Sequence, residues 1–179
     1  MSKQNLIEET RIGLWGEKED PRPWTGIRSI PENLVLTAKE MAEDIEWYVR
    51  ESGHTGTTFP LLEDRYGKQM SGNFTMSFPK RNFVLWVDVS ETFCEALDIL
   101  GVFNLDRGKI HIHPSDPMAY LIDGGTLNIP VVKQPNHHYK DPRWLPVSFY
   151  IGHKCEDGTP CPNSTKNIEK SDIQYQGNG

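Results

Sequence analysis

The sequence lacks the features that mark secreted and membrane-spanning proteins. Three cysteines in 179 residues are too few for a disulfide framework. No stretch approaches the roughly 18 consecutive apolar residues of a transmembrane helix. The start of the chain, residues 1–12, is polar and charged and has no apolar signal-peptide region. We therefore expect a cytoplasmic protein that does not associate with a membrane.

Basic residues are also too few for a nucleic-acid-binding protein. The chain has 19 lysines and arginines against 25 acidic residues, a net charge of −6 at pH 7. No basic stripe that could neutralise phosphates is visible, so we expect no nucleic-acid partner. Thirteen of the acidic residues but only eight of the basic ones lie in the first 67 residues. This acidity either attracts a basic protein partner or only keeps the protein soluble.

Familiar catalytic motifs are absent as well. The sequence contains neither a nucleophile elbow nor a glycine-rich phosphate-binding loop. No reaction type and no substrate therefore follow from a motif alone.

The length and aromatic content of the chain predict one folded domain. Five tryptophans, seven phenylalanines and six tyrosines supply large side chains for a core. Prolines and glycines among charged residues predict an extended N-terminal arm over residues 1–28. We place a single α+β domain at residues 29–160 and a polar C-terminal tail at residues 161–179.

Two helices are predicted between residues 29 and 101. Ser29 and Glu32 have the spacing of a capping box, with Pro31 in the first turn, and a three- and four-residue apolar repeat follows as far as Gly53. A shorter helix is expected from Asp88 or Ser90 to the glycine at position 101. The segment between them, residues 54–72, reads as a loop with a buried patch.

The remaining regular structure is predicted to be β-strand. Alternating polar and apolar residues, or short apolar runs, indicate strands over 74–78, 83–89, 109–113, 120–122, 126–132 and 145–153. A turn at 123–125 would join two of them as a hairpin. The fold class is therefore α+β, with a mainly antiparallel or mixed sheet of about six strands, one long helix and one short helix.

A His-x-His step in one predicted strand is the most informative feature of the sequence. His111 and His113 are two residues apart, so a strand places both imidazoles on the same face. Ile110 and Ile112 then occupy the opposite face, which we expect to pack on the core. On a solvated face the histidines would be ordinary polar residues, whereas in a cleft they would form half of a metal site.

A metal site needs further ligands. His153 ends a predicted strand and is the best candidate, and a carboxylate could come from Asp116 or Asp123, which closely follow the histidine pair. With His111 and His113, they predict a site for one divalent ion: zinc, iron or manganese. The corresponding function is a small metal- or ligand-binding domain, with hydrolysis as the reaction to test.

A second function remains open: a non-catalytic acidic protein-binding module of the inhibitor or immunity type. Glu40, Glu43 and Asp44 lie on the predicted polar face of the long helix, and Trp15 and Trp24 lie in the arm. Together they predict a surface for a basic protein partner, because tryptophan is common at interface hot spots.

Overall fold

The architecture is α+β, as predicted. The computed structural model describes residues 2–12, 29–51, 56–103, 108–134, 137–152 and 174–177. In these residues the α-helices are α1 (Lys3–Ile12), α2 (Ala38–Glu51), α3 (Phe59–Tyr66), α4 (Glu91–Leu100) and α5 (Pro117–Ile122). The strands are β1 (Ser71–Phe78), β2 (Phe83–Val89), β3 (Ile110–Pro114), β4 (Arg143–Trp144), β5 (Val147–Ile151) and β6 (Gln174–Gly177), with 3-10 turns η2 (Gly67–Gln69) and η3 (Pro79–Arg81).

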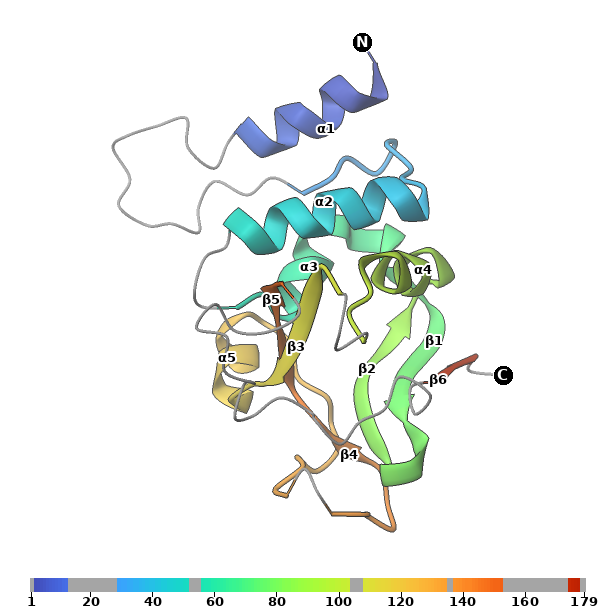
Figure 1. The fold of residues 1–179 in the computed structure, drawn as a ribbon, viewed down its shortest axis with the longest axis vertical. Helices are drawn as coiled ribbons and strands as arrows, with labels where there is room; N and C mark the ends of the chain where they lie inside the picture. The colour runs from blue at the N-terminus through green and yellow to red at the C-terminus, as the bar shows by residue number, and fades with distance from the viewer. Residues whose placement is uncertain are drawn as a thin grey trace.

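The strands form two separate sheets. The larger sheet has the order β4-β2-β1-β6 and is mixed, because β2 pairs with β4 in parallel while β1 pairs with β2 and β6 antiparallel. The smaller sheet is the antiparallel pair β3-β5. α1 lies across α2 at one end of the molecule, with both sheets on the other side of α2 (Figure 1). No described helix is both long and apolar enough to cross a membrane.

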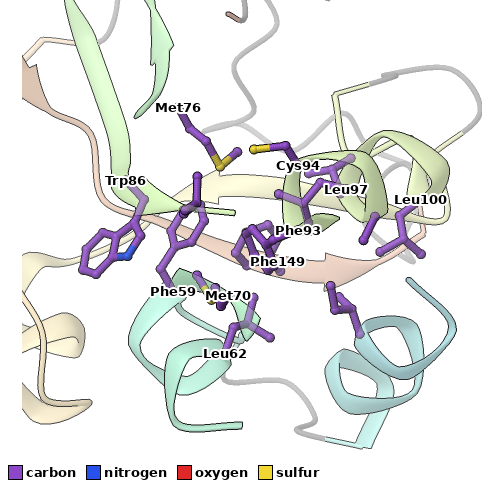
Figure 2. Packing of buried hydrophobic residues seen from close by; sticks show 14 of the residues in the cluster. Phe59, Leu62, Met70, Met76, Trp86, Phe93, Cys94, Leu97, Leu100 and Phe149 are labelled. Carbon is purple, nitrogen blue, oxygen red and sulfur yellow. The ribbon is translucent and has the colours of Figure 1, made fainter. Parts of the chain in front are cut away.

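Aromatic side chains fill the core between the two sheets and α3. The Phe59 ring stacks on Trp86 with centroids 5.4 Å apart and meets the edge of Phe149 at 5.0 Å. Phe93 of α4 completes this group (Figure 2). Because these rings come from α3, β2, β5 and α4, a single cluster holds both sheets and two helices together.

The long helix begins later than the sequence predicts. Ser29 does not cap a helix; its hydroxyl donates to the backbone carbonyl of Asp64. α2 starts after Thr37, whose amide and hydroxyl donate to the Glu40 carboxylate while the Glu40 amide donates to the Thr37 hydroxyl. This is a complete capping box eight residues downstream of the predicted one.

Three further predictions of local structure are wrong. Residues 59–66, expected as a loop, form α3, with the predicted apolar patch at its start. Residues 117–122 form a helix and not a strand, because Asp116 caps the helix and Pro117 suits its first position. Residues 126–132 contain only an isolated bridge between Val131 and Trp144. The number of helices predicted, two, is therefore too low.

The described parts of both chain ends have regular structure, while the division into an arm at 1–28, a domain at 29–160 and a tail at 161–179 stays a prediction. The N-terminal segment is helical from Lys3 to Ile12 and not extended, and Ile7 is only 2% exposed. Near the C-terminus, Gln174–Gly177 forms β6 on the edge of the larger sheet. Both segments pack onto the central region.

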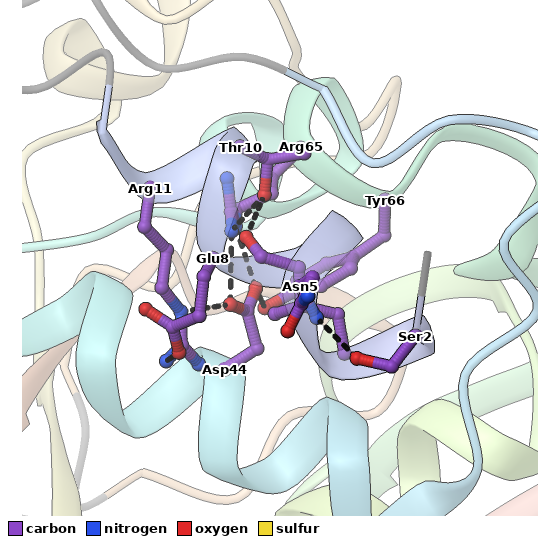
Figure 3. Close-up of polar contacts among 9 residues, drawn as sticks. Ser2, Asn5, Glu8, Thr10, Arg11, Asp44, Arg65 and Tyr66 are labelled. Atoms are coloured by element: carbon purple, nitrogen blue, oxygen red, sulfur yellow. Dashed lines mark hydrogen bonds and ion pairs between the residues drawn. The ribbon is translucent and has the colours of Figure 1, made fainter.

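A buried ion-pair network ties α1, α2 and α3 together (Figure 3). The Asp44 carboxylate accepts from Arg65 Nε at 2.6 Å and from a terminal nitrogen of Arg65 at 2.9 Å. It also accepts from Arg11 Nε and from the Tyr66 hydroxyl, both at 2.9 Å. The side chains of Asp44 and Arg65 are completely buried, and Arg65 also donates to the Thr10 hydroxyl. A charge in this position is tolerated because every partner is a hydrogen-bond donor of matching geometry.

Thr37→Ala should lower the free energy of unfolding by about 1 kcal/mol, because it removes the reciprocal cap of α2. Urea denaturation followed by circular dichroism measures this change. Thr126→Ala, on an exposed residue of an irregular segment, is the control and should change stability by less than about 0.5 kcal/mol. Equal effects of the two substitutions would contradict the role of Thr37.

Asp44→Ala should destabilise the fold by about 3–5 kcal/mol, because it leaves the Arg65 guanidinium buried without a counter-charge. Glu43→Ala, one residue earlier and exposed, should change stability by less than about 0.5 kcal/mol. In the double variant Asp44→Ala/Arg65→Met part of the lost stability should return. A double variant no more stable than Asp44→Ala would refute the unpaired-charge explanation.

Candidate functional site

The predicted His-x-His strand exists, and its two faces are as expected. In the β3-β5 pair, His111 lies opposite Tyr150 and His113 lies opposite Ser148. Ile110 and Ile112 belong to the hydrophobic core, with exposed fractions of 0% and 6%. The histidines therefore share the face of the small sheet that points away from this core.

A backbone hydrogen bond fixes the orientation of the His111 ring. His111 is buried, and its Nδ1 lies 2.6 Å from the carbonyl oxygen of Gly152. A carbonyl oxygen only accepts, so Nδ1 carries the proton and donates it. In the neutral ring the lone pair is then on Nε2, the arrangement that orients histidine ligands in metal sites.

Three rings form a compact cluster around this histidine. The ring centroids of His111 and His113 are 4.7 Å apart, and His113 is 4.9 Å from Tyr150. Two imidazoles bound to one tetrahedral ion at about 2 Å have centroids about 5 Å apart. The spacing of the pair therefore suits a single shared ligand.

The electrostatics of the cluster favour neutral imidazole. The pKa of His113 lies below its ordinary value of 6.5, chiefly because of burial and further because of the neighbouring His111. Neutral imidazole is the form that coordinates metals and accepts protons. His113 is thus kept in its neutral, metal-coordinating form near neutral pH.

A glycine closes one side of the cluster. A Cβ on Gly56 would lie 2.7 Å from the Tyr150 hydroxyl and 2.8 Å from Ser148 Cβ, and the Gly56 φ angle is +76°. Only glycine fits such a close approach in this conformation. The next residue, Thr57, exchanges backbone hydrogen bonds with Phe149, so this segment runs along β5.

Gly56 and Tyr150 were not among the predicted site residues. Tyr150 could have been found, because it alternates with Phe149 and Ile151 in the predicted strand and so faces away from the core. Gly56 gave no such signal, because its partner lies more than ninety positions away and only the fold brings them together.

The other predicted metal ligands do not join the pair among the described residues. The Asp116 carboxylate accepts from the amide of Met118 at 2.9 Å as the cap of α5. In the described parts of the chain, no group of three or more histidine, cysteine or acidic side chains could hold a metal ion. His153 lies outside the described residues, so its role as a ligand stays a prediction.

Asp44 was predicted to be part of an acidic partner surface, and this prediction is wrong. Its side chain is completely buried in the network with Arg65 and is not part of an exposed helix face. Glu40 accepts from Lys3 of α1 at 2.5 Å, which together with Thr37 lowers the pKa of Glu40 to about 2. Of the three predicted acids, Glu43 is the exposed one, facing Lys39 at 4.0 Å. Both predicted arm tryptophans, Trp15 and Trp24, lie outside the described residues.

A pocket of about 590 Å³ adjoins the ring cluster. It lies between α3 and α5 and is lined by Gly56, Thr58, Leu61, Asp64, Ala119, Ile122 and Asp123. Gly56 belongs to its wall and also touches the Tyr150 ring, so one residue separates the pocket from the cluster. The volume is typical of small-molecule sites.

No protein-family model, curated protein or solved structure matches this chain. The candidate site consists of His111, whose ring is oriented by the Gly152 carbonyl, and His113, whose pKa is lowered, beside a tyrosine and a pocket of ligand size.

The free energy of unfolding should fall as the pH is lowered from 7 to 5, partly because of His113. Its pKa is lower in the folded state than the ordinary 6.5, so below that pH the unfolded state binds the proton more readily. The fall should be smaller in His113→Asn. His138→Asn, on an exposed residue of a loop, should retain the wild-type dependence. Denaturant unfolding at a series of pH values tests this, and identical slopes for His113→Asn and wild type would contradict it.

Proposed function

We propose that this protein is a metal-binding domain that holds one divalent transition-metal ion at the His111–His113 face, with hydrolysis as the reaction it supports. The observation that carries the proposal is the bond from His111 Nδ1 to the Gly152 carbonyl, which orients the ring and puts the lone pair of the neutral imidazole on Nε2. A bound ion with an open position would supply an activated water molecule near neutral pH.

The ligand type narrows the choice of metal. Two imidazoles suit zinc and iron, whereas manganese prefers carboxylate and carbonyl oxygens. Of the predicted carboxylate ligands, Asp116 already caps α5 and Asp123 accepts from Thr58. Zinc or iron is therefore favoured over manganese, and we choose zinc for the test because it involves no redox change.

The pair alone does not complete a tetrahedral site, and His153 is the proposed third ligand. The carbonyl that orients His111 belongs to Gly152, which directly precedes His153 in the sequence. The proposed third ligand is thus the next residue along the chain from a carbonyl that already contacts His111. The ring of Tyr150 borders both imidazoles and would shield one side of a bound ion from water.

The alternative function, binding of a basic protein through the acidic helix face, receives less support. α1 packs against that face: Arg11 donates to Asp44 and Lys3 donates to Glu40. Two of the three proposed acids are therefore neutralised within the chain, and we favour the metal-binding function.

Zinc binding by the purified protein tests the proposal. Isothermal titration of the metal-free protein should give one zinc ion per chain, and His113→Ala should weaken binding by more than about 100-fold, since loss of a ligand exceeds the 10–100-fold effect of an outer-shell group. His138→Ala is the matched control, because its Nδ1 also contacts a backbone carbonyl, that of Lys80 at 2.8 Å, on an exposed loop.

Two outcomes distinguish the parts of this proposal. Equal zinc affinity in His113→Ala and His138→Ala would refute the histidine site. If His113→Ala weakens zinc binding as expected and His153→Ala leaves the zinc affinity unchanged, the histidine pair is supported and His153 is rejected as the third ligand. Circular dichroism of each variant checks that the fold is intact.

A further inference from the structure

The pocket between α3 and α5 has a chemistry of its own. Asp64 at the end of α3 and Asp123 just after α5 place two carboxylates in its wall. The Thr58 hydroxyl donates to Oδ2 of Asp123 at 2.6 Å. This bond holds the Asp123 carboxylate in place, and no partner of its second oxygen, Oδ1, is found in the described parts of the chain.

In the described parts of the chain, no basic side chain forms an ion pair with either of these two acids. Arg65, the basic residue of α3, is completely buried and donates to Asp44 on the α2 side. Among the described residues, neither Asp64 nor Asp123 makes an ion pair. A third acid, Glu63, lies next to Asp64 and accepts from the Trp86 indole at 2.7 Å. The described residues therefore give the pocket a negative potential and supply no counter-ion for it.

The rest of the pocket and its rim are apolar. Leu61, Ala119 and Ile122 line it. On α5, Met118 is 56% exposed and Leu121 60%, although both are large apolar side chains. An exposed apolar patch beside a cavity is typical of a ligand or partner site.

We propose that this pocket binds a small amphipathic organic cation, a free molecule with an ammonium or guanidinium group on an apolar body. The cationic group would lie between Asp64 and Asp123, and the apolar body would pack on Leu61 and Ile122. Charge complementarity selects this class, because an anion would face two carboxylates and a neutral apolar molecule would leave them unpaired.

The pKa of Tyr48 is consistent with a negative potential in the pocket. Tyr48 is 2% exposed, and burial is the main reason that its pKa is raised to about 12. Asp64 and Asp123 both raise that pKa further, against the lowering effect of Arg65. Two carboxylates on opposite walls of the pocket therefore act on the same buried hydroxyl.

The inference does not depend on the proposed metal site. No pocket residue is a proposed ligand, and the test below uses no metal, so the two can fail separately. The same cationic group could also be presented by an arginine or lysine of a protein. We commit to the free molecule because the volume of this half-open pocket, about 590 Å³, is that of a small-molecule site.

Binding of 4-phenylbutylamine, compared with its neutral analogue 4-phenylbutan-1-ol, tests the proposal. In ¹⁵N-labelled protein, the amine should shift the amide resonances of Gly56, Thr58, Ala119 and Asp123 in a saturable way. The alcohol should bind about tenfold more weakly or worse, because it leaves the carboxylates unpaired.

Single substitutions locate the site. Asp64→Asn and Asp123→Asn should each weaken amine binding about tenfold or more, and an asparagine at 123 can still accept from Thr58. Glu95→Gln removes the same charge from an exposed position on α4 and should leave binding unchanged. Ala119→Phe fills the pocket while retaining both acids, and should abolish the saturable shifts.

Several results would overturn the proposal. They are equal affinity for amine and alcohol, an equal effect of Glu95→Gln and Asp64→Asn, and unchanged binding in Ala119→Phe. Absence of saturable shifts with the amine, combined with binding of an arginine-containing peptide at the same residues, would identify a protein-docking surface and reject the free ligand. Each variant is folded if its amide resonances outside the pocket match those of the wild type.

Discussion

The buried ion pair between Asp44 and Arg65 is the constraint on which the arrangement of this protein depends. Asp44 lies on α2 and Arg65 on α3, and neither charge has access to water. An unpaired charge in that position would be strongly destabilising, so α2 and α3 can pack only in the register that joins these two side chains. Arg11 and Thr10 bring α1 to the same point, so one network sets the position of three helices.

The consequences reach the functional region through α3. One end of this helix carries Arg65, and the other is preceded by Gly56, Thr57 and Thr58. With Arg65 held, Thr57 pairs with Phe149 of β5 and Gly56 lies against Tyr150, which borders the histidine pair. The same helix forms one wall of the pocket. Residues 56–58 therefore contact the ring cluster on one side and line the pocket on the other.

Local sequence signals succeeded where the decisive contacts are close in the chain. The helix from Glu91, with Ser90 as its cap, and strands β1, β2, β3 and β5 all follow from apolar periodicity and turn residues. The start of α2 was missed because two candidate capping boxes occur, at Ser29 and at Thr37, and tertiary contacts decide between them. Asp44 was misjudged for a related reason: periodicity places it on a polar face, but only the fold brings Arg65 and Arg11 to that face.

The sequence by itself determined the α+β class and the common face of His111 and His113, because strand geometry alternates side chains regardless of what surrounds them. It could not reveal the bond from His111 to Gly152 or the contact of Gly56 with Tyr150. Nor could it reveal the pocket that joins Asp64 to Asp123. Each of these pairs residues forty or more positions apart. Such contacts depend on how the helices and sheets pack, and that packing is set by the buried aromatic cluster and the Asp44–Arg65 pair.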